Sequence, residues 1–200
     1  MSYARKTCPW LYNGFSAAGG AVDETTILEG RRMIVDSTVE PVMPMLRAVG
    51  KIPSGLFVVT AGQGPQMCAM LVSFVQQLSM EPICIGVAVH KDRAIGKAIE
   101  NSGGFTLNIC HAGDRTLLRR FAGKSFMGDA AALSELPSRH LPNGAVVLTA
   151  ACAYVCCQRP KVLDFGGDHL LYVGVAADGD VLTPDDARPM VHVRHDGSKY

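Results

Sequence analysis

The sequence predicts a mainly β protein, a barrel of short strands accompanied by a few short helices. Three observations lead to this fold class. Short runs rich in β-branched and apolar residues, each bounded by Gly, Pro or Asn, recur through the middle and the end of the chain. Helical spacing of apolar residues is confined to brief stretches. No repeat with a period of about 20 to 50 residues is present, which excludes solenoids and leaves a barrel as the architecture that many short strands favour.

Size and charge restrict the possible classes of protein. The chain has 200 residues, of which 48% are hydrophobic and 18% are charged, enough for the core of one domain. The 19 basic and 18 acidic side chains nearly cancel, so neither a nucleic acid nor an anionic membrane surface is an expected partner. No stretch approaches the ~20 apolar residues of a membrane span, and Met1 to Trp10 precede no signal-peptide core.

The N-terminal region differs from the rest of the chain. Residues 1–45 show no sustained periodicity, and we expect them to form an extended arm or cap before a domain at 46–200. A first helix is predicted from Pro41 to Gly50, with apolar residues at Val42, Met45, Leu46 and Val49.

The strands follow in two series separated by a polar stretch, Lys124 to Gly144, in which we expect a loop or a short helix. Gly62-Gln63-Gly64 is predicted to connect a hairpin, and Asp178-Gly179 is predicted to be a second hairpin turn before a brief run at Val181-Leu182. The predicted strands are Leu56 to Ala61, Met67 to Ser73, Ile83 to Val89, Phe105 to Cys110, Val146 to Thr149, Ala151 to Gln158 and His169 to Ala176.

Two further short helices are predicted within the first series. One runs from Arg93 to Ile99 with Asp92 as its possible cap, and the other from Arg115 to Phe121 with Asp114 in the same role.

Seven cysteines, mostly inside apolar runs, suggest reduced and buried thiols and therefore a cytoplasmic protein. No C-x-x-C pair exists, and strand alternation turns Cys156 and Cys157 to opposite faces, so we expect no metal site. Cys110 and His111 also point apart if they lie on a strand, which disfavours a thiol nucleophile.

The clearest candidate for binding chemistry is Lys91-Asp92-Arg93. It lies where a strand ends and a helix begins, so two cations and free helix N–H groups are available for a phosphate. The alternative is a solvated charged turn in which Asp92 caps the helix. The stretch Met70 to Val75 by itself predicts only a buried strand.

Five segments in order resemble the flavin reductase-like family with the FMN-binding split-barrel fold, over roughly Lys51 to Tyr200. The resemblance includes the module at the C-terminal end of flavodiiron proteins, which has similar residues at Ala69-Met70-Leu71 and at Lys91 to Ile95. The five segments are Ile52 to Ala61, Met70 to Pro82, Val87 to Arg93, Gly104 to Ile109 and Gly167-Asp168-His169.

The resemblance implies a flavin site on two segments. The Met70 to Ser79 segment would contact the ring and ribityl chain, with an apolar wall and polar groups, and the Lys91-Asp92-Arg93 turn would hold the phosphate. The family often has Thr-Ala-Ser where this chain has Leu71-Val72-Ser73, and Pro-Pro where it has Pro82-Ile83. The implied cofactor residues are Met70, Leu71, Val72, Ser73, Gln77, Ser79, Lys91, Asp92 and Arg93, with Phe74 as additional wall.

The resemblance also implies a role for His169, which would lie near the flavin or the nicotinamide and orient the donor. The alternative is a histidine at a strand start bonded to Asp168. His192, Arg194 and His195 fit a site cover, a dimer interface or a polar edge strand, and receive no assignment.

The function that follows from the resemblance is an NAD(P)H-dependent flavin reductase. It would bind FMN, with FAD less expected, take electrons from NADH or NADPH, and pass them to flavin, oxygen or a protein acceptor. No flavodiiron or flavodoxin-like sequence precedes the segment in the printed chain, so we expect it to act alone or with a separate partner, as a homodimer of the family's type. The alternatives are a non-enzymatic electron-transfer flavoprotein with FMN reduced by a protein donor, or a barrel that holds haem or another planar cofactor.

Overall fold

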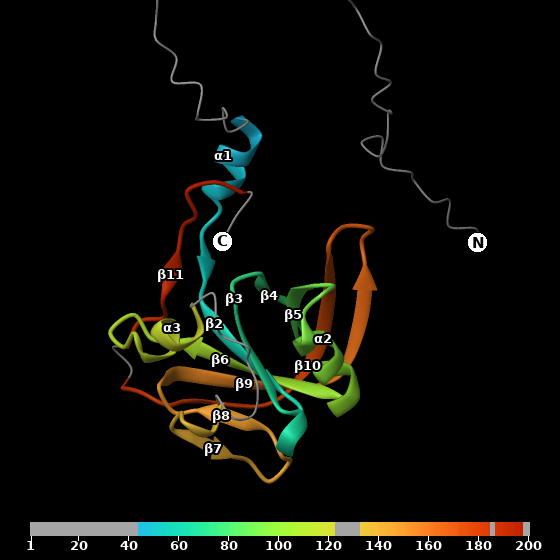
Figure 1. The fold of residues 1–200 in the computed structure, drawn as a ribbon, viewed down its shortest axis with the longest axis vertical. Coiled ribbons are helices and arrows are strands. Elements are labelled where there is room, and N and C mark those ends of the chain that lie inside the picture. Colours follow the sequence, from blue (N-terminus) through green and yellow to red (C-terminus); the bar gives the residue numbers. More distant parts are fainter. Residues whose placement is uncertain (1–43, 123–132, 185–186, 198–200) are drawn as a thin grey trace, which may run out of the picture. The chain divides into compact units, whose positions relative to one another are not determined.

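Seven antiparallel strands form one sheet in the computed structural model, which describes residues 44–122, 133–184 and 187–197 (Figure 1). Their order across the sheet is β3-β2-β6-β9-β10-β5-β4. The mainly β prediction is confirmed. The strands are β2 (Phe57–Ala61), β3 (Cys68–Val72), β4 (Val75–Met80), β5 (Ile83–His90), β6 (Gly104–Cys110), β9 (Ala151–Asp164) and β10 (His169–Val181).

The two edge strands of this sheet, β3 and β4, are consecutive in the chain. Only Ser73 and Phe74 join them, and the three Cα–Cα steps from Val72 to Val75 span at most about 11 Å. The two edges must therefore meet at this junction, which curls the sheet into a barrel. The Phe74 carbonyl accepts the Ala88 N–H at 2.9 Å and fastens the junction to β5. Strand β4 was not predicted separately from β3.

The second and third helices contact strands of the barrel sheet, whereas the first lies away from it (Figure 1). The helices α1 (Pro44–Gly50), α2 (Ala94–Ser102) and α3 (Thr116–Phe121) confirm the three predictions within one to three residues of their described ends. Asp114 accepts the Thr116 N–H at 2.8 Å, but it precedes the N-cap residue of α3, which is Arg115. The expected Asp92 cap is wrong, because Arg93 is the N-cap residue of α2 and no side chain bonds there.

The interior side chains form two main cores. One lies inside the barrel and contains Val59, Val87 and Tyr172 together with Ile95 and Ile99 of α2. The second packs under α3 and contains Leu117 and Phe121. Strand β3 contributes to both, because Met70 and Val72 face the first core whereas Leu71 faces the second.

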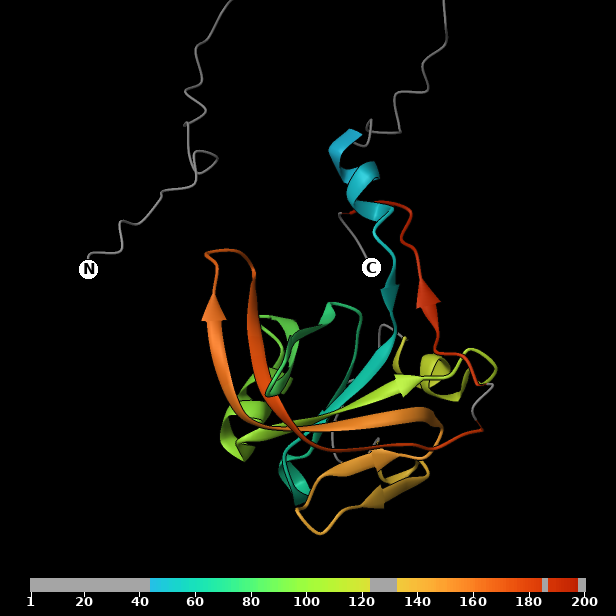
Figure 2. The same cartoon turned by 180° about the vertical axis from the view of Figure 1, so that it is seen from behind.

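The turn predicted at Asp178-Gly179 is wrong, as the β9–β10 hairpin shows. Asp178-Gly179 lies inside β10, where Asp178 pairs with Cys156 and Gly179 with Val155. A Cβ on Gly179 would come within 2.9 Å of the Tyr154 carbonyl oxygen, so this glycine permits a close strand approach and forms no turn. Strand β9 also continues past the predicted end at Gln158 to Asp164. Figures 1 and 2 show the free end of this hairpin extending away from the rest of the sheet.

Two small two-stranded sheets complete the described structure (Figure 2). One pairs β7 (Ser138–His140) with β8 (Val146–Leu148), so the expected loop or short helix of 124–144 contains a strand. The other pairs β1 (Ser54–Gly55) with β11 (Val191–His192). A short 3-10 helix, Gly64–Gln66, lies within the predicted β2–β3 hairpin connection.

The predicted arm at 1–45 lies outside the described residues except for Pro44 and Met45, which belong to α1. Among the described helices, none has both the length and the apolar character that crossing a membrane requires.

Candidate functional site

The junction between β3 and β4 presents one buried hydroxyl. Ser73 is 3% exposed, and its Oγ is the buried side-chain N or O atom in the described part of the chain that has no hydrogen-bond partner. Buried polar groups are nearly always bonded in folded proteins, so an unpartnered one calls for an explanation such as a missing ligand. The next residue, Phe74, is 37% exposed.

Three aromatic rings form a row that starts at this junction. The Phe74 ring lies 5.6 Å from the His169 ring, and the His169 ring lies 5.3 Å from the His90 ring, each in an edge-to-face arrangement. His90 ends β5 and His169 begins β10, and the two are directly paired across the strands. The Arg194 guanidinium carbon lies 5.0 Å from the centre of the Phe74 ring. We call Phe74, His169 and His90 the ring row.

His169 is oriented by its neighbour. Its Nδ1 lies 2.7 Å from the Asp168 Oδ1, and this hydrogen bond holds the pKa of the Asp168 carboxyl below its usual range. With the carboxylate as acceptor, Nδ1 carries the hydrogen and Nε2 is left for another contact. The predicted alternative, a strand-start histidine bonded to Asp168, describes this local geometry correctly.

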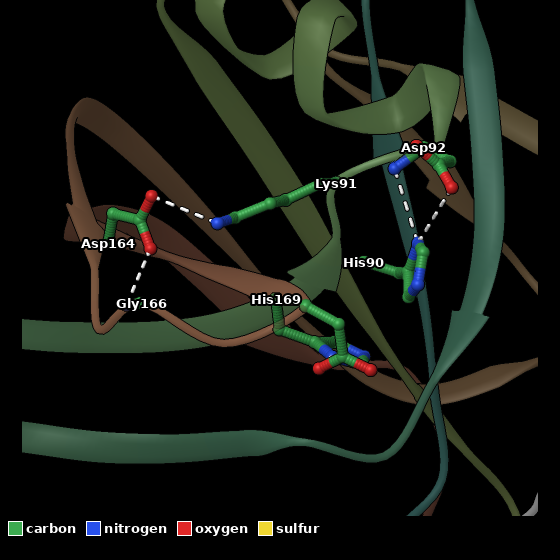
Figure 3. Close-up of polar contacts among 7 residues, drawn as sticks. His90, Lys91, Asp92, Asp164, Gly166 and His169 are labelled. Carbon is green, nitrogen blue, oxygen red and sulfur yellow. Dashed lines mark hydrogen bonds and ion pairs between the residues drawn. The ribbon is translucent and has the colours of Figure 1, made fainter.

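The Lys91 side chain is paired within the site (Figure 3). Its Nζ lies 3.0 Å from the Asp164 Oδ2, at the tip of the β9–β10 hairpin. The Gly166 N–H and then Lys91 lower the pKa of the Asp164 carboxyl. The Lys91 N–H also donates to the Asp168 carbonyl at 2.9 Å. The hairpin tip and the β5–α2 turn are therefore held together.

Asp92 and Arg93 complete that turn. The Asp92 N–H donates to His90 Nδ1 at 3.2 Å, and the Asp92 carboxylate lies 3.7 Å from the same nitrogen (Figure 3). Asp92 therefore contacts the ring row. Arg93 is exposed and is the N-cap residue of α2, whose first N–H groups have no side-chain cap. Such groups favour an anion.

The other predicted cofactor residues are divided by strand alternation. Met70 and Val72 pack against the barrel core and Leu71 against the α3 core, so they do not share one face. On β4, Gln77 Nε2 donates to the Ser79 carbonyl oxygen at 3.2 Å.

Two residues at the site had no predicted role. His90 was part of a quoted segment, but only the register of β5 with β10 places it against His169. Arg194 was left unassigned, and it reaches Phe74 from a segment distant in sequence. Neither carries a local sequence signal that distinguishes it from an ordinary polar residue.

Two cavities of about 230 and 560 Å³ lie elsewhere, along the β2–β3 connection. They share Gly62, Gln63, Met67 and Ser102, and none of the sequence-predicted site residues lines either one. The candidate site is therefore distinct from both cavities.

The buried thiols are unsuited to nucleophilic chemistry. Burial raises the pKa of Cys110 to about 12 and that of Cys157 to about 12, so both are protonated at neutral pH. Cys156 and Cys157 belong to different cores, which confirms their predicted opposite orientations. Among residues 44–122, 133–184 and 187–197, no three His, Cys, Asp or Glu side chains are grouped to hold a metal ion.

Comparison with known proteins identifies the family. Residues 49–198 match the family model described as a flavin reductase like domain. Diflavin flavoprotein A 2 of Nostoc sp. is 33% identical over 156 residues, which are 78% of this chain and 27% of that protein. The chain thus spans about a quarter of the length of the curated relatives it matches.

Solved structures agree on the fold. The Streptomyces globisporus C-1027 NADH:FAD oxidoreductase SgcE6 superposes with a TM-score of 0.64 at 23% identity, covering 72% of this chain and 84% of that one. BorF, the flavin reductase component of a bacterial two-component tryptophan halogenase, has a TM-score of 0.65 at 23% identity and covers 76% and 92%. The family model, which matches most of the chain, shows that the chain belongs to the flavin reductase-like family.

Proposed function

We propose that this protein is an NAD(P)H-dependent flavin reductase that binds FMN at the β3–β4 junction. The observation that carries the proposal is the buried, unpartnered Ser73 Oγ, in the residue next to Phe74 of the ring row and within the segment predicted to contact flavin. A flavin ring has carbonyl and nitrogen groups at one edge that can bond this hydroxyl, so the residues fit the cofactor.

The phosphate of FMN would lie at the β5–α2 turn. Arg93 and the uncapped N–H groups of α2 supply positive charge there. Lys91 is paired with Asp164, and it would bind phosphate by leaving or sharing that contact. Asp92 would act indirectly, because its N–H bonds His90. One phosphate turn suits a mononucleotide, which is why we propose FMN in preference to FAD.

The ring row would position the electron donor. FMN, when bound, supplies a ring that accepts a hydride from the nicotinamide of NADH or NADPH. The chain's own contribution is to hold two flat rings together and to exclude water. His169, with Nδ1 committed to Asp168, would present Nε2 to the donor. Such a site requires no catalytic triad.

The electron acceptor would be free flavin, oxygen or a separate protein. The matched relatives are named diflavin flavoproteins, and the matched segment makes up about a quarter of their length, which is consistent with a partner protein as acceptor. No disulfide joins any two of the six described cysteines, and on that ground we propose the reducing cytoplasm as the compartment.

A homodimer is proposed from exposed apolar side chains on the β4–β5 hairpin. Met80 is 82% exposed, Ile83 49% and Leu78 48%. A hairpin at a sheet edge with this composition favours association with a second copy.

The proposal is tested by mixing the FMN-loaded protein with NADH or NADPH without oxygen. We expect the visible flavin absorbance to bleach within seconds. A protein that fails with both nucleotides but is bleached by a reduced iron protein would be an electron-transfer flavoprotein instead. A haem-type spectrum in the purified protein would exclude the flavin proposal.

A further inference from the structure

The residues before and after Arg194 in the sequence are both fixed by contacts with other segments. Before it, His192 of β11 pairs with Ser54 of β1. After it, the Gly197 N–H donates to the Leu46 carbonyl of α1 at 2.7 Å. A Cβ on Gly50 would come within 2.5 Å of the Asp196 backbone, so the segment and α1 are in close contact. The position of Arg194 is therefore set by packing.

The Arg194 side chain is half-buried and lies against the exposed end of the ring row. A guanidinium at 5.0 Å from a ring centre is within cation–π range, so Phe74 supports its plane. A supported guanidinium can make two parallel bonds to one phosphate.

A cation is therefore available near each end of the ring row, Arg93 in the turn that follows His90 and Arg194 against Phe74, although Asp92 at the first end is an anion. His90 adjoins the Lys91–Arg93 turn and the N-terminus of α2, whereas Phe74 adjoins Arg194. In the proposed function the first end holds the FMN phosphate. The donor brings a second ring and its own phosphates to the same row, and these need a separate cation.

We propose that Arg194 binds the phosphates of the nicotinamide dinucleotide and thereby positions the donor. This inference rests on the proposed reductase function. Arg194 would contribute to donor affinity without entering hydride transfer, and it would leave the flavin phosphate to the β5–α2 turn.

The test compares Arg194→Ala and Arg194→Lys with the unmodified FMN-loaded protein. For Arg194→Ala we expect KM for the donor to rise about tenfold, equivalent to about 1.4 kcal/mol. We expect kcat and the FMN Kd to change less than about twofold, because chemistry and flavin binding use other residues. Arg194→Lys should recover part of the KM loss, and raising the salt concentration should reduce the difference between the variants.

Arg188→Ala is the matched control, since it removes an exposed arginine from the same C-terminal stretch and should leave KM unchanged. If KM rises equally for NADH and NADPH in Arg194→Ala, Arg194 binds the pyrophosphate. If KM rises for NADPH alone, Arg194 binds the 2′-phosphate. An unchanged donor KM in Arg194→Ala, or an FMN Kd raised by the same factor, overturns the inference while the function stands. If the unmodified protein reacts with neither nucleotide, the proposed function fails, and this inference fails with it.

Discussion

At the scale of single residues, the Ser73 hydroxyl is expected to lower the stability of the fold and to contribute to ligand binding. Its buried Oγ has no partner among the described residues, and a group of this kind destabilises a fold by about 1 to 3 kcal/mol. A site that binds a ligand often retains such a group because the ligand satisfies it.

We predict that Ser73→Ala changes stability and FMN affinity in opposite directions. The flavin-free protein should gain about 1 kcal/mol in unfolding free energy, because the unpartnered hydroxyl is gone. FMN affinity should fall about tenfold, because the flavin loses a hydrogen bond. Denaturant unfolding and fluorescence titration measure the two effects. Ser138→Ala, an exposed serine on β7, should change neither, and unchanged FMN affinity in Ser73→Ala would argue against the proposed site.

Tyr172 makes stability depend on alkaline pH. Burial, followed by the hydrogen bond to Glu100, raises the pKa of Tyr172 to about 12. The folded pKa lies above the unfolded value of about 10, so the stabilisation is complete below about pH 10 and is lost as pH rises toward 12. Urea unfolding from pH 9 to 12 should show a loss of about 2 kcal/mol that is absent in Tyr172→Phe. Equal losses in the two proteins would contradict the assignment.

At the scale of elements, Asn108 joins three strands through one side chain. Its Nδ2 donates to the Val58 carbonyl of β2 at 3.0 Å, and its Oδ1 accepts the Leu148 N–H of β8 at 2.8 Å. Asn108 is fully buried on β6. It attaches the β7–β8 hairpin to the barrel.

Asn108→Ala should lower the unfolding free energy by about 3 kcal/mol, because it leaves a buried N–H and a buried carbonyl unpaired. Asn143→Ala is the matched control. Asn143 is exposed and its Oδ1 accepts only the nearby Ala145 N–H among the bonds described. Asn143→Ala should therefore lower the unfolding free energy by less than about 1 kcal/mol. Chemical denaturation compares the two variants, and similar losses would show that the buried bridge is unimportant.

The β5–α2 turn should distinguish flavins by their phosphate. Lys91 is paired with Asp164, whereas Arg93 caps α2 without a side-chain bond. We expect Arg93→Ala to weaken FMN binding about tenfold and Lys91→Ala to weaken it less. Riboflavin lacks the phosphate, so its affinity should change in neither variant.

Asp164→Asn supplies the complementary measurement, because it releases Lys91 from its ion pair and should strengthen FMN binding. Fluorescence titrations of both flavins check these outcomes. An equal loss of riboflavin affinity in Arg93→Ala would show that the turn holds some other part of the cofactor.

At the scale of the whole molecule, the exposed hairpin of β4 and β5 should control assembly. Leu78 and Met80 are apolar and solvent-exposed on an edge strand. We predict that Leu78→Glu with Met80→Glu converts a dimer into a monomer, because two charges would be buried in the contact. Sedimentation velocity measures the change. A wild-type monomer would contradict the proposed homodimer.

The barrel itself shows how local and long-range information combine. The predicted strands and helices followed from apolar spacing, whereas β4 and β7 were missed, and the Gly62-Gln63-Gly64 connection followed from turn composition. Asp178-Gly179 was misassigned because the same dipeptide suits a turn and a close strand approach. Only the partner strand decides between these possibilities.

The candidate site was similarly predictable in part. The resemblance of the segments pointed to Ser73, the Lys91–Arg93 turn and His169. In the structure the Lys91 N–H bonds Asp168 beside His169, and Phe74, the residue after Ser73, packs against His169. His90 and Arg194 were not assigned, because strand register and C-terminal packing bring them to the ring row. The pairing of Lys91 with Asp164 depends in the same way on the length of the β9–β10 hairpin.

The sequence by itself determined the mainly β class, the described helices and the family, because side-chain periodicity, capping and motif order are properties of neighbouring residues. The tertiary structure decided which edge strands meet at Ser73 and Phe74, which histidines pair, and which cations lie near the two ends of the ring row. These outcomes depend on contacts between segments far apart in the chain, and local pattern does not specify such contacts.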